Sequence, residues 1–194
     1  MELNEADLDP DPLRQFDTWF EAAREAGLRA PEAMALSTAT PDGAPSARMV
    51  LLKGADERGF VFFTSYESRK GSELDANPCA ALLFYWEPLG RQVRVEGTVE
   101  RASAEESDAY FASRAPGSRA GAAASRQSRP LADRAELDRA VAALGDDAPR
   151  PEWWGGYRVR PEGYEFWQHR ENRLHDRFRY EHDGSAWSIQ RLYP

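Results

Sequence analysis

The chain has 194 residues, of which 41% are hydrophobic and 30% charged, and its 25 basic and 33 acidic side chains give a formal net charge of −8. These values describe a single globular domain over residues 1–194, long enough to bury roughly 70% of the unfolded chain's surface. They exclude collagen-like, coiled-coil and disulfide-scaffold proteins, and the acidic balance argues against a nucleic-acid partner.

The sequence also predicts where the protein works. Its longest apolar run, residues 79–86, is far shorter than the ~20 residues that cross a bilayer, so we expect no membrane partner. Cys79 is the one cysteine and cannot form an internal disulfide, which favours the cytoplasm. Its apolar surroundings predict a buried hydrophobe rather than a nucleophile. Residues 1–11 carry five acids and no base, and we expect them to be flexible.

The first predicted elements are a helix and a hairpin. Asp11 and Pro12 have the types preferred at a helix N-cap and first position, and apolar residues follow at helical spacing until Gly27. Residues 34–38 and 46–53 are separated by a Pro-Asp-Gly turn, which predicts two paired strands.

Strands and short helices alternate in the next part of the chain. Residues 60–65 predict a strand, and Ser68 begins a short helix that Asn77-Pro78 ends. Two long strands follow over 80–86 and 91–101, with a bulge expected at Gly97. A capping box formed by Ser103 and Glu106 then opens a helix that reaches about Arg114.

The last third of the chain returns to strands. Residues 115–130 are small and polar, which favours a flexible linker, and 133–144 predict a helix. Four further strands are expected over 154–159, 164–168, 173–181 and 186–192, the last pair joined at Asp183-Gly184. Many short strands with inserted helices predict a mainly β fold, an antiparallel barrel, rather than a doubly wound sheet.

Several kinds of active site are excluded by missing motifs. No strand is followed by Gly-x-Gly-x-x-Gly, and no glycine-rich loop ends in Gly-Lys-Ser/Thr. The three histidines lack the Cys or His partners of a zinc site, so no metal is expected. Because no Ser-His-Asp or paired-carboxylate arrangement stands out, an enzyme of this sequence would depend on an organic cofactor.

Two basic pairs are candidates for phosphate binding. Arg69 and Lys70 fall in the first turn of a predicted helix, where the helix dipole disfavours cations unless an anion is bound. A solvated surface pair explains the same residues equally well. Arg48 and Lys53 are five residues apart on a predicted strand, so their side chains are expected on opposite faces, serving different neighbours.

A third basic cluster lies near the C-terminus. Arg173, His175 and Arg177 are spaced by two, which places them on one face of the predicted strand. Three potential cations on one face repel one another, so an anionic ligand would stabilise them. The alternative is a solvent-exposed strand edge, which tolerates such a set without a ligand.

The order and spacing of several segments resemble the pyridoxamine 5′-phosphate oxidases (pyridoxine/pyridoxamine 5′-phosphate oxidases), flavin enzymes of vitamin B6 metabolism, over nearly the whole chain. The segments are Arg48-Met-Val-Leu-Leu-Lys53, Ser68-Arg69-Lys70, Asn77-Pro78, Arg91-Gln92-Val93, Gln127-Ser128, Trp154-Gly155-Gly156-Tyr157, Glu165-Phe166-Trp167-Gln168, Arg173-Leu-His-Asp-Arg177 and Arg191-Leu192-Tyr193-Pro194. The resemblance implies an FMN-binding split barrel and a homodimer with FMN at the subunit interface. It also implies oxidation of pyridoxamine or pyridoxine 5′-phosphate to pyridoxal 5′-phosphate, with O2 as acceptor and H2O2 as product.

The resemblance also implies roles for individual residues. The cofactor site would contain Arg48, Met49, Val50, Leu51, Leu52, Lys53, Phe63, Thr64, Arg69, Lys70, Gln92, Gln127, Ser128, Trp167 and Arg177. The substrate would meet Lys53, Tyr110, Arg114, Ser118, Arg173 and His175. Within this set, Arg173 and His175 would be the catalytic pair, over the pyridine ring and its reacting carbon.

The chain departs from the family pattern at a few positions. Phe63 replaces a usual tyrosine, Tyr85 and Ala115 replace prolines, Ala123 replaces a common tryptophan, and His169-Arg170 replaces a segment that often contains glycine. Two alternatives follow. A phenazine-type FMN oxidase would act on a carboxylated polycyclic substrate, and a non-catalytic protein would bind a flavin or B6 phosphate without turnover. The presence of Lys53, Tyr110, Arg114 and Ser118 favours the phosphorylated B6 substrate over the first alternative.

Overall fold

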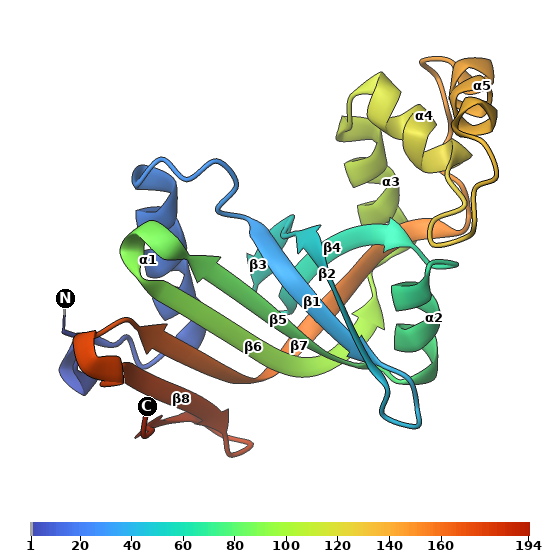
Figure 1. Cartoon of the computed structure of the whole chain (residues 1–194). Coiled ribbons are helices and arrows are strands. Elements are labelled where there is room, and N and C mark those ends of the chain that lie inside the picture. Colours follow the sequence, from blue (N-terminus) through green and yellow to red (C-terminus); the bar gives the residue numbers. More distant parts are fainter. Residues whose placement is uncertain (1) are drawn as a thin grey trace.

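The computed structural model describes residues 2–194 as a mainly antiparallel sheet, curled into a half-barrel and flanked by helices, which confirms the predicted fold class (Figure 1). The strands are β1 (Ala33–Ala39), β2 (Pro45–Leu51), β3 (Gly54–Asp56), β4 (Gly59–Ser65), β5 (Cys79–Trp86), β6 (Arg91–Arg101), β7 (Trp154–Gln168), β8 (Asp176–His182) and β9 (Trp187–Arg191). The α-helices are α1 (Pro12–Glu25), α2 (Arg69–Ala76), α3 (Ala104–Ser113), α4 (Pro116–Ala124) and α5 (Arg134–Leu144).

The sheet is organised around β7. Its strand order is β2-β1-β5-β6-β7-β4-β3, and β8 joins β7 outside this path and pairs with β9. The first half of β7 pairs with β4 and the second half with β8, while β6 runs along both halves. Residues predicted as two strands, 154–159 and 164–168, are therefore one strand. The long β7 links the two ends of the molecule.

The core is aromatic and lies between α1 and the sheet. Asp11 caps α1 by accepting a hydrogen bond from the Leu13 amide, as the sequence predicts. Phe16 is fully buried, and its ring centroid lies 4.9 Å from that of Phe60 and 5.0 Å from that of Phe84. Burying such rings supplies much of the stabilisation of a domain of this size.

The described part of the N-terminal segment, residues 2–11, packs against the rest of the fold. Leu3 and Leu8 are buried with the core. The Leu3 amide donates to the Asp176 carboxylate at 3.1 Å, and Arg191 donates to both Asp176 and the Leu3 carbonyl. Asp176 thus ties residues from both ends of the chain to the start of β8.

Two local predictions are wrong for identifiable reasons. Part of the predicted linker, residues 116–124, is the helix α4, because Pro116 stands at its first turn and an alanine-rich stretch follows. Cys79 is exposed rather than buried, because burial alternates along β5 and places this first residue on the outer face. The short strand β3, which pairs with β4, was not predicted from the sequence.

Gly97 forms the predicted bulge in β6, where the register with β7 shifts. A Cβ atom at this position would lie 1.9 Å from the Arg160 carbonyl oxygen, so an alanine forces the two backbones apart. We expect Gly97→Ala to lower the free energy of unfolding by about 2 kcal/mol or more, measured by urea denaturation. Gly117→Ala, at a position with open space, is the control. An equal loss in both variants would contradict the steric explanation.

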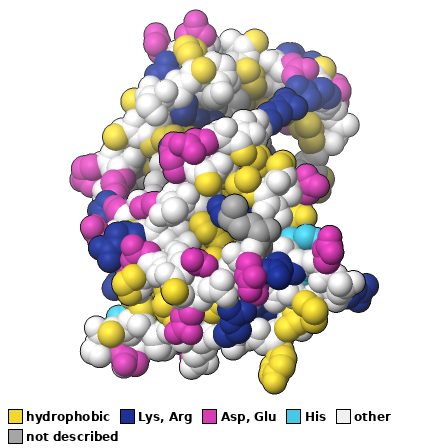
Figure 2. All heavy atoms as spheres, turned by 90° about the vertical axis from the view of Figure 1, so that its left-hand side faces the viewer, with side chains coloured by type: hydrophobic (Ala, Val, Ile, Leu, Met, Phe, Trp, Pro, Cys, Tyr) yellow, Lys and Arg dark blue, Asp and Glu magenta, His cyan; other side chains and the backbone are white. Residues whose placement is uncertain are grey.

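The helices and the surface show the following features. No helix within residues 2–194 combines the length and apolar character needed to span a bilayer. Acidic and basic side chains are interspersed over the face that contains α1 and β8 (Figure 2). The charge of this face is mixed, in contrast to that of the pocket described next.

Candidate functional site

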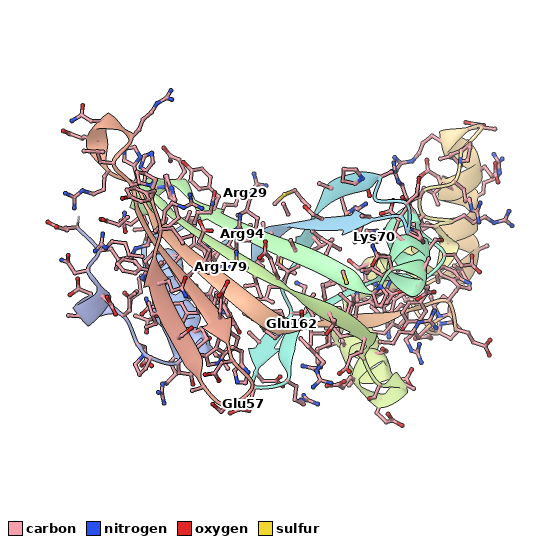
Figure 3. The ribbon with its side chains drawn as sticks, turned by 90° about the horizontal axis from the view of Figure 1, so that it is seen from below. Arg29, Glu57, Lys70, Arg94, Glu162 and Arg179 are labelled. Atoms are coloured by element: carbon pink, nitrogen blue, oxygen red, sulfur yellow. The ribbon has the colours of Figure 1, made fainter. Side chains whose placement is uncertain are left out.

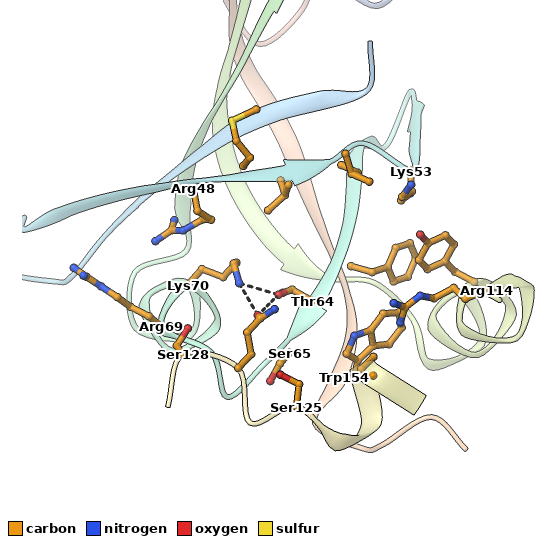
Figure 4. A pocket seen from close by; sticks show the side chains of 18 of the residues that line it. Arg48, Lys53, Thr64, Ser65, Arg69, Lys70, Arg114, Ser125, Ser128 and Trp154 are labelled. Atoms are coloured by element: carbon orange, nitrogen blue, oxygen red, sulfur yellow. Dashed lines mark hydrogen bonds between the residues drawn. The ribbon is translucent and has the colours of Figure 1, made fainter. Parts of the chain in front are cut away.

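A pocket of about 720 Å³ lies between β2, β4 and the helices α2, α3 and α4, within the size range of small-molecule sites (Figure 4). Five of its lining residues are cationic, and no Asp or Glu occurs among those that the structure describes: Arg48, Lys53, Arg69, Lys70 and Arg114. Arg48, Arg69 and Lys70 lie on one side of the pocket, and Lys53 and Arg114 lie on the other. A chain of net charge −8 therefore builds a cationic pocket with two basic ends.

Lys70 occupies the first basic end and is held by neutral partners. Its Nζ donates to Thr64 Oγ1 at 3.0 Å, Ser68 Oγ at 3.2 Å and Gln127 Oε1 at 2.7 Å. Burial and the neighbouring Arg48 lower the pKa of Lys70 to about 8. A buried ammonium group without a carboxylate partner is costly, and a bound anion would offset that cost.

Arg48 and Arg69 share a buried carboxylate behind the pocket wall. Glu73 lies one turn after Arg69 on α2, and its Oε1 accepts from Arg69 Nε at 2.8 Å. Its Oε2 accepts from Ser46 Oγ at 2.5 Å, from Thr38 Oγ1, and from Arg48 Nη2 at 3.3 Å. The basic end is thus a preformed network rather than a set of free side chains.

Three aromatic rings lie beside the two cations of the second basic end. The Phe63 and Tyr110 rings are 4.1 Å apart at 20°, and Trp154 continues the stack at 5.7 Å from Phe63. Lys53 Nζ lies 5.8 Å from the Tyr110 ring, and the Arg114 guanidinium lies 5.0 Å from Trp154. Arg114 Nη1 is buried without a hydrogen-bond partner among the described residues, which suits an anionic ligand.

The pocket brings together most of the predicted cofactor residues. Its lining includes Arg48, Met49, Val50, Leu51, Lys53, Phe63, Thr64, Arg69, Lys70, Gln127 and Ser128, together with the predicted substrate residues Tyr110 and Arg114. Arg48 and Lys53 both line the pocket but lie at its opposite ends, so each has different neighbours. Because β2 ends at Leu51, the alternation of faces along the strand does not extend to Lys53. Leu52 is buried, and neither it nor the exposed Ser118 lines the pocket.

A second group of predicted residues lies elsewhere on the sheet. Gln92, Trp167 and Arg177 are direct cross-strand partners on β6, β7 and β8, so their side chains share one face. Glu165 is buried beside them and accepts from Arg177 Nε at 2.9 Å and Arg94 Nη2 at 2.7 Å. Lys70 and Arg94 are well separated in Figure 3. None of these residues lines the pocket.

The predicted strand over residues 173–181 begins later than expected. Asn172 and Arg173 have φ angles of 55° and 62°, and the turn η3 (Glu171–Arg173) precedes β8. Left-handed backbone is incompatible with an extended strand, so Arg173, His175 and Arg177 do not share one strand face. His175 lies beside β8 with its ring 4.5 Å from Trp167, and its Nδ1 accepts from the Arg170 amide. Arg173 is exposed.

Sequence reasoning missed the groups that support the pocket. Glu73, Thr38 and Ser46 carry no family motif, and the only available signal was the spacing of four between Arg69 and Glu73 on a helix. Trp154, which was named from the sequence only as part of a family segment, is buried and also lines the pocket. No group of three or more potential metal ligands lies together within residues 2–194.

Two models of known protein families together match most of the chain. Residues 20–146 match the family described as pyridoxamine 5′-phosphate oxidase, and residues 154–194 match the pyridoxine 5′-phosphate oxidase C-terminal dimerisation region. A pyridoxine/pyridoxamine 5′-phosphate oxidase from Rubrobacter xylanophilus is 62% identical over 99% of this chain and 91% of its own length. Its counterpart from Burkholderia multivorans is 59% identical over 99% of this chain and 93% of its own length.

Solved structures show the same architecture. PhzG from Burkholderia lata, solved with tetrahydrophenazine-1-carboxylic acid, superposes with a TM-score of 0.94 at 37% identity, over 100% of this chain and 98% of that one. An FMN-binding protein from Nostoc punctiforme related to pyridoxamine 5′-phosphate oxidase has a TM-score of 0.79 at 18% identity, over 96% of this chain and 100% of that one. The second likeness concerns the fold alone.

Proposed function

Because the chain belongs to the pyridoxamine 5′-phosphate oxidase family, we propose that it is an FMN-dependent oxidase that converts pyridoxamine or pyridoxine 5′-phosphate to pyridoxal 5′-phosphate. In this reaction O2 is the electron acceptor and H2O2 the product. The cofactor is FMN. The observation that carries the proposal is a pocket with two separate basic ends, since both FMN and the substrate bear a phosphate.

The residues of the pocket fit FMN. Arg48, Arg69 and Lys70 would hold its phosphate, and Lys70 lacks a carboxylate partner that would compete with it. Backbone and side chains of residues 49–51 and 63–64 would line the ring system. When bound, FMN supplies hydride acceptance and transfer of the electrons to O2.

The other end of the pocket would hold the substrate. Lys53 and Arg114 would bind its phosphate beside the aromatic rings, with Lys53 next to Tyr110 and Arg114 next to Trp154. The chain's contribution to the rate would be to orient the reacting carbon and to stabilise charge, because no Asp, Glu or His occurs among the described residues that line the pocket. His175 accepts a hydrogen bond at Nδ1, so its neutral form has a proton on Nε2 available to donate.

A homodimer would complete the site. Residues 154–194 match a dimerisation region, and Met49, Leu51 and Tyr85 are exposed apolar residues of the sheet, 64%, 42% and 57% exposed. Exposed apolar side chains of this size favour coverage by a second copy. We place FMN at that interface, with Gln92, Trp167, Arg173, His175 and Arg177 contributed by the partner subunit.

The decisive experiment is to purify the protein, record its absorbance for bound flavin, and measure H2O2 release with pyridoxamine and pyridoxine 5′-phosphates. Turnover with either vitamer, and none with the unphosphorylated form, would support the proposal. The likeness to PhzG favours one further candidate, oxidation of a carboxylated polycyclic substrate, which the same assay tests with tetrahydrophenazine-1-carboxylic acid. Bound flavin without any turnover would instead indicate a binding protein. The single cysteine fits a reducing compartment, and we place the reaction in the cytoplasm.

A further inference from the structure

The carboxylate of Glu73 stands behind the first basic end without lining the pocket. We propose that Glu73 is a positioning residue for the cofactor phosphate: it fixes the Arg48 and Arg69 side chains from two different elements before FMN arrives. This inference rests on the proposed function, because it assigns the first basic end to FMN.

The two oxygens of Glu73 connect separate parts of the fold. Oε1 accepts from Arg69 on the same helix, while Oε2 accepts from Ser46, Thr38 and Arg48 on the β1–β2 hairpin. Arg48 Nη1 is fixed further by donating to Thr38 Oγ1 at 2.6 Å and to the Leu36 carbonyl at 3.1 Å. The carboxylate therefore sets the relative position of α2 and the hairpin at the pocket.

The side chain is charged and buried. Glu73 is 5% exposed. Burial alone would raise the pKa of this carboxyl, but hydrogen bonds from Ser46, Thr38 and Arg69 outweigh it and lower the pKa to about 2. A desolvated carboxylate that remains ionised must keep its donors in place, which orders both arginines.

A simple electrostatic role and a positioning role for Glu73 predict opposite changes in FMN affinity when this residue is replaced. If Glu73 acted only as a nearby negative charge, its removal would strengthen the binding of a phosphate dianion. If it positions Arg48 and Arg69, its removal weakens binding, because the arginines must then be ordered by the ligand itself. A glutamine cannot replace it, since its amide accepts at one atom only and would present N–H groups to the donors at the other.

The test is the dissociation constant for FMN, measured by quenching of flavin fluorescence on titration of cofactor-free protein. We expect E73Q to weaken FMN binding at least about tenfold and to leave the affinity for riboflavin, which lacks the phosphate, nearly unchanged. E73D, which keeps the charge but shortens the side chain, is expected to weaken FMN binding as well. The matched control is D75N on the same helix, which removes the 2.7 Å ion pair with Arg101 outside the pocket.

Each outcome decides one question. Wild-type protein that binds no FMN would refute the proposed function itself. Unchanged or tighter FMN binding in E73Q, or an equal loss for FMN and riboflavin, would refute the positioning role alone. If E73Q and E73D do not give folded protein by circular dichroism, T38V provides the test: it removes one donor to Glu73 and one acceptor of Arg48 without touching the pocket lining. Undiminished FMN affinity in T38V would then count against the proposal.

Discussion

Lys70→Met is expected to weaken FMN binding by about 10- to 100-fold while making the cofactor-free protein more stable. The binding loss follows from removal of a charged donor at the phosphate end. The gain in stability follows from the pKa of Lys70, lowered to about 8 by burial and Arg48, because the folded state disfavours this ammonium ion. Removing the ammonium ion raises the free energy of unfolding of the cofactor-free protein by at most about 3 kcal/mol at pH 7.

The measurements are FMN titration and urea denaturation of the cofactor-free protein, with Arg134→Met on the exposed face of α5 as the control. In the wild type, Lys70 has a folded-state pKa below its unfolded value of about 10.4, so stability should rise between pH 8 and 10.4. FMN affinity should be level between about pH 7 and 8, where the phosphate is a dianion, and should fall above pH 8 as the ammonium loses its proton. A less stable Lys70→Met protein, or the same pH dependence in the variant, would contradict this assignment.

Arg114→Ala is expected to raise the KM for pyridoxamine 5′-phosphate by about 10- to 100-fold, with a smaller change in kcat. Arg114 lies over Trp154 at the end of the pocket opposite Lys70, and its Nη1 has no partner among the described residues. An arginine poised in this way contributes binding to a phosphate without taking part in hydride transfer.

Steady-state H2O2 release gives the two kinetic constants, and FMN fluorescence gives the cofactor affinity. Arg134→Ala, which removes an arginine from the exposed face of α5, should leave all three unchanged. Loss of FMN from Arg114→Ala would place this residue at the cofactor and would overturn the division of the pocket into a cofactor end and a substrate end.

Local sequence signals predicted most of the fold. The Asp11 cap, the capping box at Ser103 and the bulge at Gly97 were all visible because each depends on a few neighbouring residues. The wrong predictions of secondary structure arose where two sequence signals favour different structures. In residues 116–124 small residues resemble a linker, yet Pro116 and the alanines stabilise a helix. At Asn172 and Arg173 the alternation of side chains favours a strand, but the backbone is left-handed.

The residues of the candidate site were predictable only where they belong to a recognisable sequence motif. Arg69 and Lys70 were found from their place at a helix start, but Gln127, which accepts a hydrogen bond from Lys70, comes from a distant part of the chain. Contacts between distant segments depend on tertiary packing, which single-sequence patterns do not encode. The same limit applies to Arg48 and Lys53: the sequence predicts different neighbours for them, but not that both line one pocket.

The division of the candidate residues into a pocket group and a sheet-face group has a genetic consequence. In a homodimer with shared sites, a chain carrying Lys70→Met and a chain carrying Arg177→Met would each be impaired when expressed alone. In a mixed dimer, one site would contain both substituted residues. The other site would contain an unchanged Lys70 from one chain and an unchanged Arg177 from the other. Co-expression of two defective alleles should therefore restore part of the activity, and a strain carrying both could grow where neither single allele supports growth.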